Sequence, residues 1–495
     1  MRYLLLAGDQ ALSAGASEEA VRAFDAALTL FEKGTHTQLE AEILRKRGTG
    51  HRGLGAWDKA AADWERALPV LEAAGDKAQV ADICWALAFV TLWSNRVTEA
   101  LALAERGLRA VGEEVSARRC RLIACTGLAH STAGNYENAQ TFSDRALAMA
   151  EELGDERLLG GEVLLLRAYL YHHFLMPTRL VEVGERAVEL VRRSGTPWDL
   201  SRTLGITLFG WTCTGRFDLV EQSLPEIEAV SARTGDLGTQ SQTPVARFLA
   251  ELARGELETA EDTITGLLDF HLFQAAEFPW ISFVYSFLGS TQLWLGNVSA
   301  ARNSFVQAVE REPVGCFTGF DQAHQLRGAI YAGDAIDDAH MRKLKELLPR
   351  TGAGTTHGSW YVLLCMVEAL AMKGRRDESA ELYPWTRKLM ELGGVFLFDW
   401  GLVERYAGIA ASAGQRWEEA EQHFENALRR AEEIPHRIEQ AELRRWYGRM
   451  LLDRDGSGDR VKAERLLDEA LAAYRKLGMP LYAAIVESLL KEASR

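Results

Sequence analysis

The chain has 495 residues, 47% of them hydrophobic, and its 56 Lys and Arg against 70 Asp and Glu give a formal net charge of −14. This composition allows a large buried core, whereas the negative charge repels nucleic acid and anionic membranes, so neither is expected as a partner. The 43 glycines are spread at nearly regular intervals, which is typical of many helices joined by short turns. Long alternating runs of β-branched residues are missing, so strands are not expected.

A signature of small, large and small residues recurs along the first two thirds of the chain, with the spacing of one helix face. Its first position advances by 40, 40, 39, 41, 40, 40 and 41 residues, through Ala20, Ala60, Ala100, Ala139, Leu180, Val220, Ala260 and Ala301. A small residue keeps step on the preceding helix, as at Gly8, Gly48 and Gly289. The repeated step predicts a series of helix pairs.

The glycines between these helices agree with the pairing. Gly15, Gly55, Gly134, Gly215, Gly255 and Gly296 fall between the two helices of a pair. Between pairs, Gly75, Gly154 and Gly235 are each followed by an Asp. A Gly that ends one helix followed by an Asp that caps the next is expected there.

The signature is blurred between Phe317 and Gly394. The stretch Phe270–Phe287 before it is rich in aromatic residues and is interpreted as core between repeats, with a helix starting at Pro279. The segment 349–358, PRTGAGTTHG, is the most loop-like in the chain and is interpreted as a loop or hinge. It divides the chain into an N-terminal solenoid, 1–348, and C-terminal repeats, 359–495.

The pattern returns after the hinge. Gly408 on a first helix is followed by Ala420, Phe424 and Ala427 on a second, and a further pair follows. This spacing resembles the tetratricopeptide repeat (TPR), a helix–turn–helix of about 34 residues. The predicted fold is therefore all-α: an α–α superhelical solenoid of about twelve TPR-like helical hairpins with a step of about 40 residues. A last helix, Pro480–Ala493, has no partner and is expected to cap the stack.

The stretch Ala441–Tyr482 and the 40-residue step also resemble the TPR half of large bacterial signalling ATPases, including multidomain proteins with an adenylate or guanylate cyclase domain. In that family the repeats serve as sensor or scaffold, and the chemistry lies in upstream domains. This sequence has no GxxxxGK[ST] phosphate loop and no room for a cyclase domain. The resemblance implies a non-catalytic portion, alone or as a fragment, with an upstream or separate ATPase or cyclase domain as a candidate partner.

In TPR proteins the first helix of each pair lines the concave face, and the resemblance implies which residues lie there. The mapped face is aromatic in mid-chain with a basic rim towards the N-terminus. Aromatic rings supply contact area and Arg can clamp a carboxylate, which suits a protein or peptide partner. The candidate partner-binding residues are Arg45, Arg52, Trp85, Phe89, Trp93, Arg121, Tyr169, His172, Phe209, Phe283 and Trp294.

Two alternatives stay open. The same rings can be core side chains, because aromatic residues mostly serve cores and long helices favour burial. The chain can also be a small-molecule-sensing regulatory domain of a signalling ATPase or transcription regulator, with the ligand in the aromatic part of the groove.

No motif supports catalysis, because Ser, His and Asp are scattered without a nucleophile elbow. His172 and His173 are adjacent and so point about 100° apart on a helix, which disfavours a metal site. The six cysteines follow no disulfide or zinc pattern and are interpreted as reduced core thiols. The chain is predicted to be a cytoplasmic scaffold that needs no cofactor and binds a protein or peptide in its concave groove. The resemblance to signalling ATPases implies a role in bacterial signalling or regulation.

Overall fold

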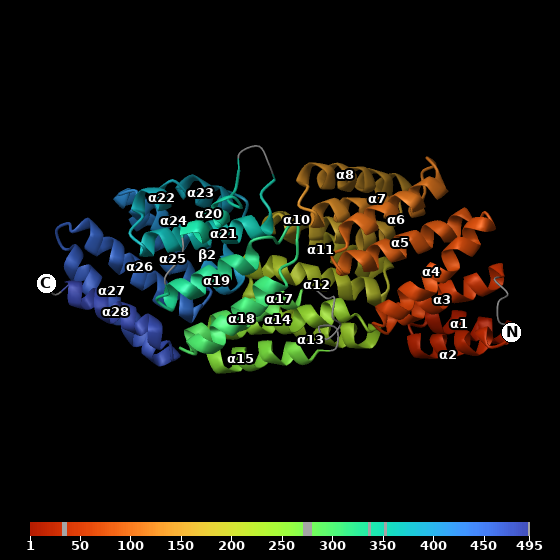
Figure 1. The fold of residues 1–495 in the computed structure, drawn as a ribbon, viewed down its shortest axis with the longest axis horizontal. Coiled ribbons are helices and arrows are strands. Elements are labelled where there is room, and N and C mark those ends of the chain that lie inside the picture. The colour runs from red at the N-terminus through yellow and green to blue at the C-terminus, as the bar shows by residue number, and fades with distance from the viewer. Residues whose placement is uncertain (32–36, 271–279, 335–337, 351–353, 494–495) are drawn as a thin grey trace. The chain divides into compact units, whose positions relative to one another are not determined.

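The computed structural model describes residues 1–31, 37–270, 280–334, 338–350 and 354–493, and within them twelve successive helix pairs precede one unpaired helix (Figure 1). The first four pairs are α1 (Arg2–Ser13) with α2 (Ser17–Leu28), α3 (Gln38–Gly53) with α4 (Trp57–Ala73), α5 (Lys77–Trp93) with α6 (Val97–Val111), and α7 (Ala117–Thr132) with α8 (Tyr136–Leu153). In the fifth pair, the first member is a continuous run of α9 (Glu156–Leu158), the π-helix η1 (Leu159–Leu164) and α10 (Leu165–His173), and the second is α11 (Pro177–Ser194). The sixth pair is α12 (Pro197–Cys213) with α13 (Phe217–Thr234).

The remaining six pairs begin at residue 237. They are α14 (Leu237–Arg254) with α15 (Leu257–Gly266) and the 3-10 turn η2 (Leu267–Asp269), α17 (Ile281–Trp294) with α18 (Val298–Glu310), α19 (Phe320–Tyr331) with α20 (Asp338–Lys345), α21 (His357–Met372) with α22 (Arg376–Ala380) and α23 (Tyr383–Glu391), α24 (Val403–Ala413) with α25 (Trp417–Glu433), and α26 (Arg437–Arg454) with α27 (Asp459–Leu477). The unpaired helix is α28 (Pro480–Ala493), as predicted, and it packs against α26 and α27. The fold is an all-α solenoid of TPR-like hairpins.

A close approach of the two helices explains the small-residue step. A Cβ atom at Gly8 would lie 2.5 Å from the ring of Phe24, and one at Gly48 would lie 2.4 Å from Nε1 of Trp64. The first positions of the signature on the second helices, Ala20 among them, are between 0% and 2% exposed. A ring on the second helix therefore occupies the space that a side chain on the first would need.

The turns and caps follow the predicted chemistry. Gly55, between α3 and α4, has φ +68°, in the left-handed region that glycine adopts without strain. At the start of α5, a side-chain oxygen of Asp76 accepts a hydrogen bond from the backbone N–H of Gln79 (3.1 Å). Asp155 caps α9 in the same way, at 3.0 Å from the N–H of Leu158. Each cap satisfies a backbone donor that the helix leaves without a partner.

The expectation that strands are absent is wrong at one place. Between α23 and α24, β1 (Phe396–Leu397) and β2 (Gly401–Leu402) form an antiparallel pair around the 3-10 turn η3 (Phe398–Trp400). Gly401 has φ +89°, which allows the tight return. This buried connection interrupts the helices just after the stretch in which the signature is blurred.

The chain divides into two compact units. Unit 1 comprises Met1–Leu170, Glu182–Thr207 and Pro225–Gln242, and unit 2 comprises Tyr171–Val181, Leu208–Leu224 and Thr243–Arg495. Both sides of the 349–358 segment belong to unit 2, and part of that segment lies outside the described residues, so the hinge stays a prediction. Pro279 and most of the aromatic stretch before it also lie outside the described residues.

We expect Gly48→Ala to lower the free energy of unfolding by about 1–3 kcal/mol, because the new methyl group overlaps the Trp64 ring. Gly266→Ala on α15 is the control, since a Cβ there has nothing within 4 Å and the change favours a helix. Urea denaturation followed by circular dichroism compares the two. Equal effects of the two substitutions would show that the close approach does not limit the pairing.

Candidate functional site

A row of aromatic rings runs between first helices of unit 1. Trp85 and Phe89 on α5 stack with ring centroids 6.0 Å apart, and Phe89 meets Trp93 edge to face at 6.4 Å. Trp93 in turn meets Tyr169 on α10 edge to face at 6.3 Å. The residues at one helical turn apart on α5 share a face, so the row follows from the sequence spacing.

Three arginines from other first helices lie against these rings. The guanidinium carbon of Arg121 on α7 is 3.9 Å from the ring centroid of Trp85, and that of Arg202 on α12 is 4.5 Å from that of Phe89. Arg52 on α3 lies 5.6 Å from both Trp85 and Trp198. Cation–π contacts of this kind hold the guanidinium plane and leave its N–H edge for other partners. We call Arg52, Trp85, Phe89, Arg121, Trp198 and Arg202 the arginine cluster.

The cluster carries more positive than negative charge. Arg121 has an ion pair with Glu162 (3.3 Å), which η1 places opposite α7. Arg52 and Arg202 have neither a hydrogen bond nor an ion pair within the described part of the chain, and Nη2 of Arg202 is buried without an acceptor. Burial of a guanidinium group without an ion-pair partner is unfavourable, so the charges of Arg52 and Arg202 are compensated only in part by their surroundings.

The pKa of Arg52 reflects this environment. Burial first, and then the neighbouring positive charge of Arg202, lower the pKa of Arg52 to about 10. Asp199 cannot relieve this charge alone, because it already accepts from Nε of Arg157 (3.1 Å) and from the hydroxyl of Thr196 (2.8 Å). Arg52 stays charged at neutral pH, and an added anion would stabilise it.

Guanidinium groups of arginines therefore cover part of the predicted aromatic surface. Trp85 and Phe89 are each 6% exposed, because the guanidinium groups lie over their faces. Trp93 and Tyr169 are half-buried. Arg45 lies apart from the cluster, with its Nε donating to Oε1 of Gln79 on α5 (3.0 Å). Sequence reasoning did not find Trp198 and Arg202, whose helix lacks the small-residue step.

The other predicted residues belong to unit 2 and lie among its aromatic side chains. His172 stacks on Phe209 with centroids 5.0 Å apart, and its backbone carbonyl accepts from Nδ1–H of His357 (3.0 Å). Phe283 meets Phe317 at 5.0 Å. Trp294 is 2% exposed and so packs in the core of unit 2.

The histidines of this region are neutral at physiological pH. Burial lowers the pKa of His357 to about 4 and that of His173 to about 3. Burial also places the pKa of His172 well below its ordinary value. Among the described residues, no group of three or more His, Cys, Asp or Glu is arranged to hold a metal ion.

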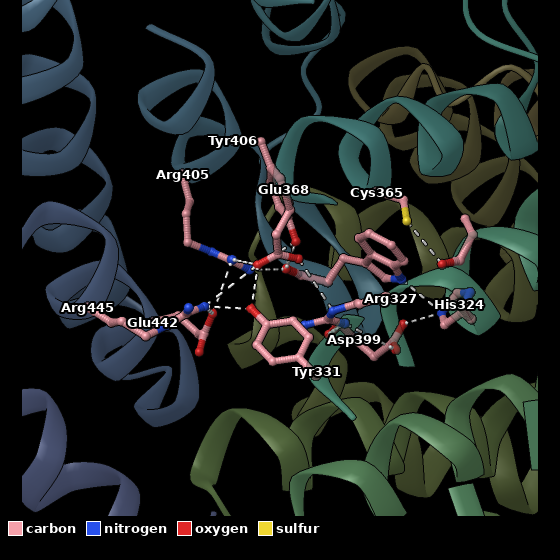
Figure 2. A network of polar contacts seen from close by, with 12 residues as sticks. His324, Arg327, Tyr331, Cys365, Glu368, Asp399, Arg405, Tyr406, Glu442 and Arg445 are labelled. Carbon is pink, nitrogen blue, oxygen red and sulfur yellow. Dashed lines mark hydrogen bonds and ion pairs between the residues drawn. The ribbon is translucent and has the colours of Figure 1, made fainter. Parts of the chain in front are cut away.

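Unit 2 contains a buried network of ion pairs (Figure 2). Nε of Arg405 donates to Oε1 of Glu439 (2.8 Å), and its Nη1 reaches Glu442 (3.3 Å) and Glu368 (3.4 Å). Its Nη2 donates to the backbone oxygen of Trp400 (2.6 Å). Arg405 is 1% exposed, and each of its three N–H-bearing nitrogens has a partner.

Arg445 and Tyr331 extend this network (Figure 2). Nη2 of Arg445 donates to Glu442 (2.7 Å) and to the hydroxyl of Tyr331 (2.6 Å), which donates to Glu368 (2.7 Å). Here, in contrast to the arginine cluster, buried carboxylates compensate the arginines. We interpret the network as structural, because buried carboxylates of the same unit partner the guanidinium groups of Arg405 and Arg445.

The carboxyl group of Glu439, which belongs to this network, has a raised pKa. Burial raises the pKa of Glu439 to about 7, although Arg405 opposes the shift. A different residue, Glu368, is the single carboxylate in the apolar run WYVLLCMVEALAM of α21. This pattern could have indicated a buried ion pair, because an unpaired carboxylate would not be buried there. The partners of Glu368 lie on helices too far along the chain to be assigned from spacing.

The six cysteines are buried thiols, in agreement with their predicted core positions. Burial raises the pKa of Cys84 to about 11 and that of Cys120 to about 12, which suppresses their reactivity. In the described part of the chain, every helix is too short or too polar to cross a membrane.

Comparisons with known proteins add only distant structural similarity. No protein-family model and no curated protein matches the chain. The Cut9–Hcn1 hetero-tetramer of the APC/C is 14% identical, covering 100% of this chain and 96% of that chain at a TM-score of 0.44. Yeast Tom70 is 13% identical, with the same coverage and a TM-score of 0.27. The human IFIT1 dimer with PPP-AAAA is 13% identical over 85% of this chain and 88% of that chain, at 0.42. At these scores the fold assignment depends on the helix pairs of the chain itself.

We expect the Glu439→Gln variant to gain stability relative to the wild type as the pH rises from 5 to 8. The folded-state pKa of Glu439 is raised to about 7, so its contribution is full at low pH and is lost as the pH rises through that value. The difference should reach roughly 1–3 kcal/mol. Urea unfolding of both proteins at pH 5, 6.5 and 8 measures it. A difference that does not change with pH would contradict the raised pKa.

Proposed function

We propose that this chain is a non-catalytic scaffold that binds an acidic segment of a protein or peptide partner at the arginine cluster of unit 1. The observation that carries this proposal is the charge of Arg52 and Arg202, neither of which has an anionic partner in the described part of the chain. A carboxylate from the partner supplies that missing charge and accepts hydrogen bonds from both guanidinium edges.

Preorganisation strengthens such a site. Arginine side chains usually lose considerable conformational freedom on binding, which weakens an exposed ion pair. Here Trp85, Phe89 and Trp198 already restrict the guanidinium planes. Part of that entropy is therefore lost on folding, before the partner arrives. Arg121 keeps Glu162 as its partner and adds positive charge behind the contact.

The half-buried Trp93 and Tyr169 extend the surface beside the charges. They offer apolar area to the residues that flank a carboxylate in the bound segment. Arg45, His172, Phe209, Phe283 and Trp294 contribute less to this account, since Arg45 has a partner on α5 and the other four belong to unit 2. The proposed surface thus uses Arg52, Trp93, Arg121, Tyr169 and Arg202.

The resemblance of Ala441–Tyr482 to the TPR half of signalling ATPases suggests where such a partner occurs. We propose a role in bacterial signalling or regulation, with an ATPase or cyclase signalling protein as the candidate partner. Sensing of a small molecule is the second candidate function, and a cavity of about 310 Å³ in unit 2, with Met372, Arg376 and Arg449 in its lining, favours it.

Isothermal titration with octaglutamate tests the acidic preference. We expect the wild type to bind octaglutamate at low salt and to bind octaglutamine at least roughly tenfold more weakly, because the amide lacks the charge. The Arg52→Gln/Arg202→Gln variant should lose roughly tenfold or more in affinity for octaglutamate. Both side chains keep N–H groups after the change, so the loss reports on charge.

The control is Arg66→Gln/Arg109→Gln, which removes the same charge from unit 1 at side chains 58% and 71% exposed. It should bind octaglutamate within about twofold of the wild type, because exposed charges act weakly. Equal losses in both double variants would show that net charge alone, and not the arginine cluster, attracts the peptide.

A further inference from the structure

The connection between α23 and α24 is buried, unlike most connections between helices. Within residues 396–402, Phe396 and Trp400 are 0% exposed and Phe398 is 6% exposed. Connections usually run over the surface, because their backbone groups find hydrogen-bond partners there. In this connection, the β1–β2 pair and side chains of other helices supply such partners. We call residues 396–402 the inner segment.

The two phenylalanines of the inner segment contact helices that come much earlier in the chain. The ring centroid of Phe398 lies 5.8 Å from that of Phe209 on α12 and 6.5 Å from that of His172 on α10. The ring centroid of Phe396 lies 5.4 Å from that of Phe217, at the start of α13. In a simple stack, each helix pair contacts only its neighbours. The inner segment follows the tenth pair, yet these rings join it to the fifth and sixth pairs.

The acid and the indole ring of the inner segment contact α19 (Figure 2). Nε2 of His324 lies 3.1 Å from Oδ1 of Asp399, and Nη1 of Arg327 donates to the backbone oxygen of Asp399 (3.3 Å). The guanidinium carbon of Arg327 lies 4.7 Å from the ring centroid of Trp400 and 5.7 Å from that of Trp294 on α17. One guanidinium group therefore contacts both residues of the segment.

The backbone of the inner segment is bound as well. The backbone oxygen of Trp400 accepts from Nη2 of Arg405 (2.6 Å) and from the hydroxyl of Tyr406 (3.0 Å). Phe398 has φ +36°, an unfavourable conformation for a residue with a side chain, which persists only where the surroundings impose it. A cavity beside the segment measures about 10 Å³, room for about one water molecule. The helices of unit 2 thus surround the segment closely.

We propose that the inner segment is an internal ligand of unit 2. It occupies the surface that first helices of this unit form, and it closes that surface to peptides from other proteins. The ligand that fits this surface is a tight turn with an aromatic residue on each side of one acid, as in Phe398, Asp399 and Trp400. The proposal does not depend on the arginine cluster, because all these contacts lie within unit 2.

A tethered segment has a large advantage over a free peptide. Tethering gives an effective concentration of about a millimolar, which a peptide at micromolar concentration does not reach. Departure of the segment would also remove Asp399 from His324 and Arg327, which are buried and would lose a charged neighbour. The surface of unit 2 therefore stays closed as long as the segment keeps its contacts.

Hydrogen exchange tests whether the inner segment holds distant helix pairs. Phe398→Ala removes the ring that contacts α10 and α12. We expect amide exchange at residues 171–173 and 208–213, the parts of these helices in unit 2, to accelerate at least roughly tenfold. Phe398→Leu, which keeps an apolar side chain but loses the ring, gives the same comparison if alanine prevents folding.

The matched control is Phe424→Ala on α25. Its ring is 0% exposed and packs against Gly408 on α24 and Tyr447 on α26, within its own pair and the next. It should accelerate exchange in α24 and α26 and leave residues 171–173 and 208–213 unchanged. Exchange at those residues that Phe398→Ala leaves unchanged, or that both variants accelerate equally, would overturn the proposal.

A peptide tests the internal ligand directly. In one variant, a Gly/Ser stretch of equal length replaces residues 396–402, and the peptide GGVFLFDWGLV (residues 393–403) is added. We expect the peptide to raise the melting temperature of this variant in a concentration-dependent way. The peptide with Asp399→Asn should need at least roughly tenfold higher concentration, because it lacks the charge that faces Arg327 and His324. Refolding from urea with and without the peptide includes a variant that folds only when the peptide is present.

The wild type is the control for peptide binding, because its own segment occupies the surface. It should bind the labelled peptide at least roughly a hundredfold more weakly than the Gly/Ser variant does. Equal binding by both proteins would show that the peptide binds elsewhere. A Gly/Ser variant that the peptide does not stabilise would show that unit 2 does not recognise the segment as a ligand. Either result would overturn the proposal.

Discussion

The contact between a glycine on the first helix and a ring on the second sets the geometry of several helix pairs. At Gly8 with Phe24, and again at Gly48 with Trp64, no room remains for even one methyl group between the helices. Because this contact recurs at a step of about 40 residues, first helices of successive pairs present corresponding residues in register. The arginine cluster and the buried network are both built from such first-helix positions.

The two units use these positions in different ways. In unit 2, Arg405 and Arg445 meet Glu368, Glu439 and Glu442, and the buried charges compensate one another. In unit 1, aromatic rings lie against the guanidinium groups of Arg52 and Arg202, which have no ion-pair partner in the described part of the chain. Cation–π contacts reduce the free-energy cost of burying a cation, but they do not neutralise its charge as an anionic partner would. This difference is why we interpret the network of unit 2 as structural and propose the arginine cluster of unit 1 as the surface for an acidic partner.

The helix pairs, the glycine turns, the aspartate caps and the last helix could be predicted from the sequence, because each depends on residues close together in the chain. The site was predictable only in part. Arg52 and Arg121 were found because the resemblance to TPR proteins places both on the concave face of a first helix. Arg202 was missed, although Phe209 on the same helix, α12, was found. The ion pairs of Glu368 and the short strands near Gly401 depend on residues far apart, which a local pattern does not connect.

The most direct test of the proposed scaffold is retention of a protein from the source cell's lysate on the immobilised chain. The account predicts a protein that the wild type and the Arg66→Gln/Arg109→Gln variant both retain and that about 0.5 M salt releases. The Arg52→Gln/Arg202→Gln variant should fail to retain it while remaining folded. A partner bound equally well by the Arg52→Gln/Arg202→Gln variant would contradict the assignment of binding to the arginine cluster.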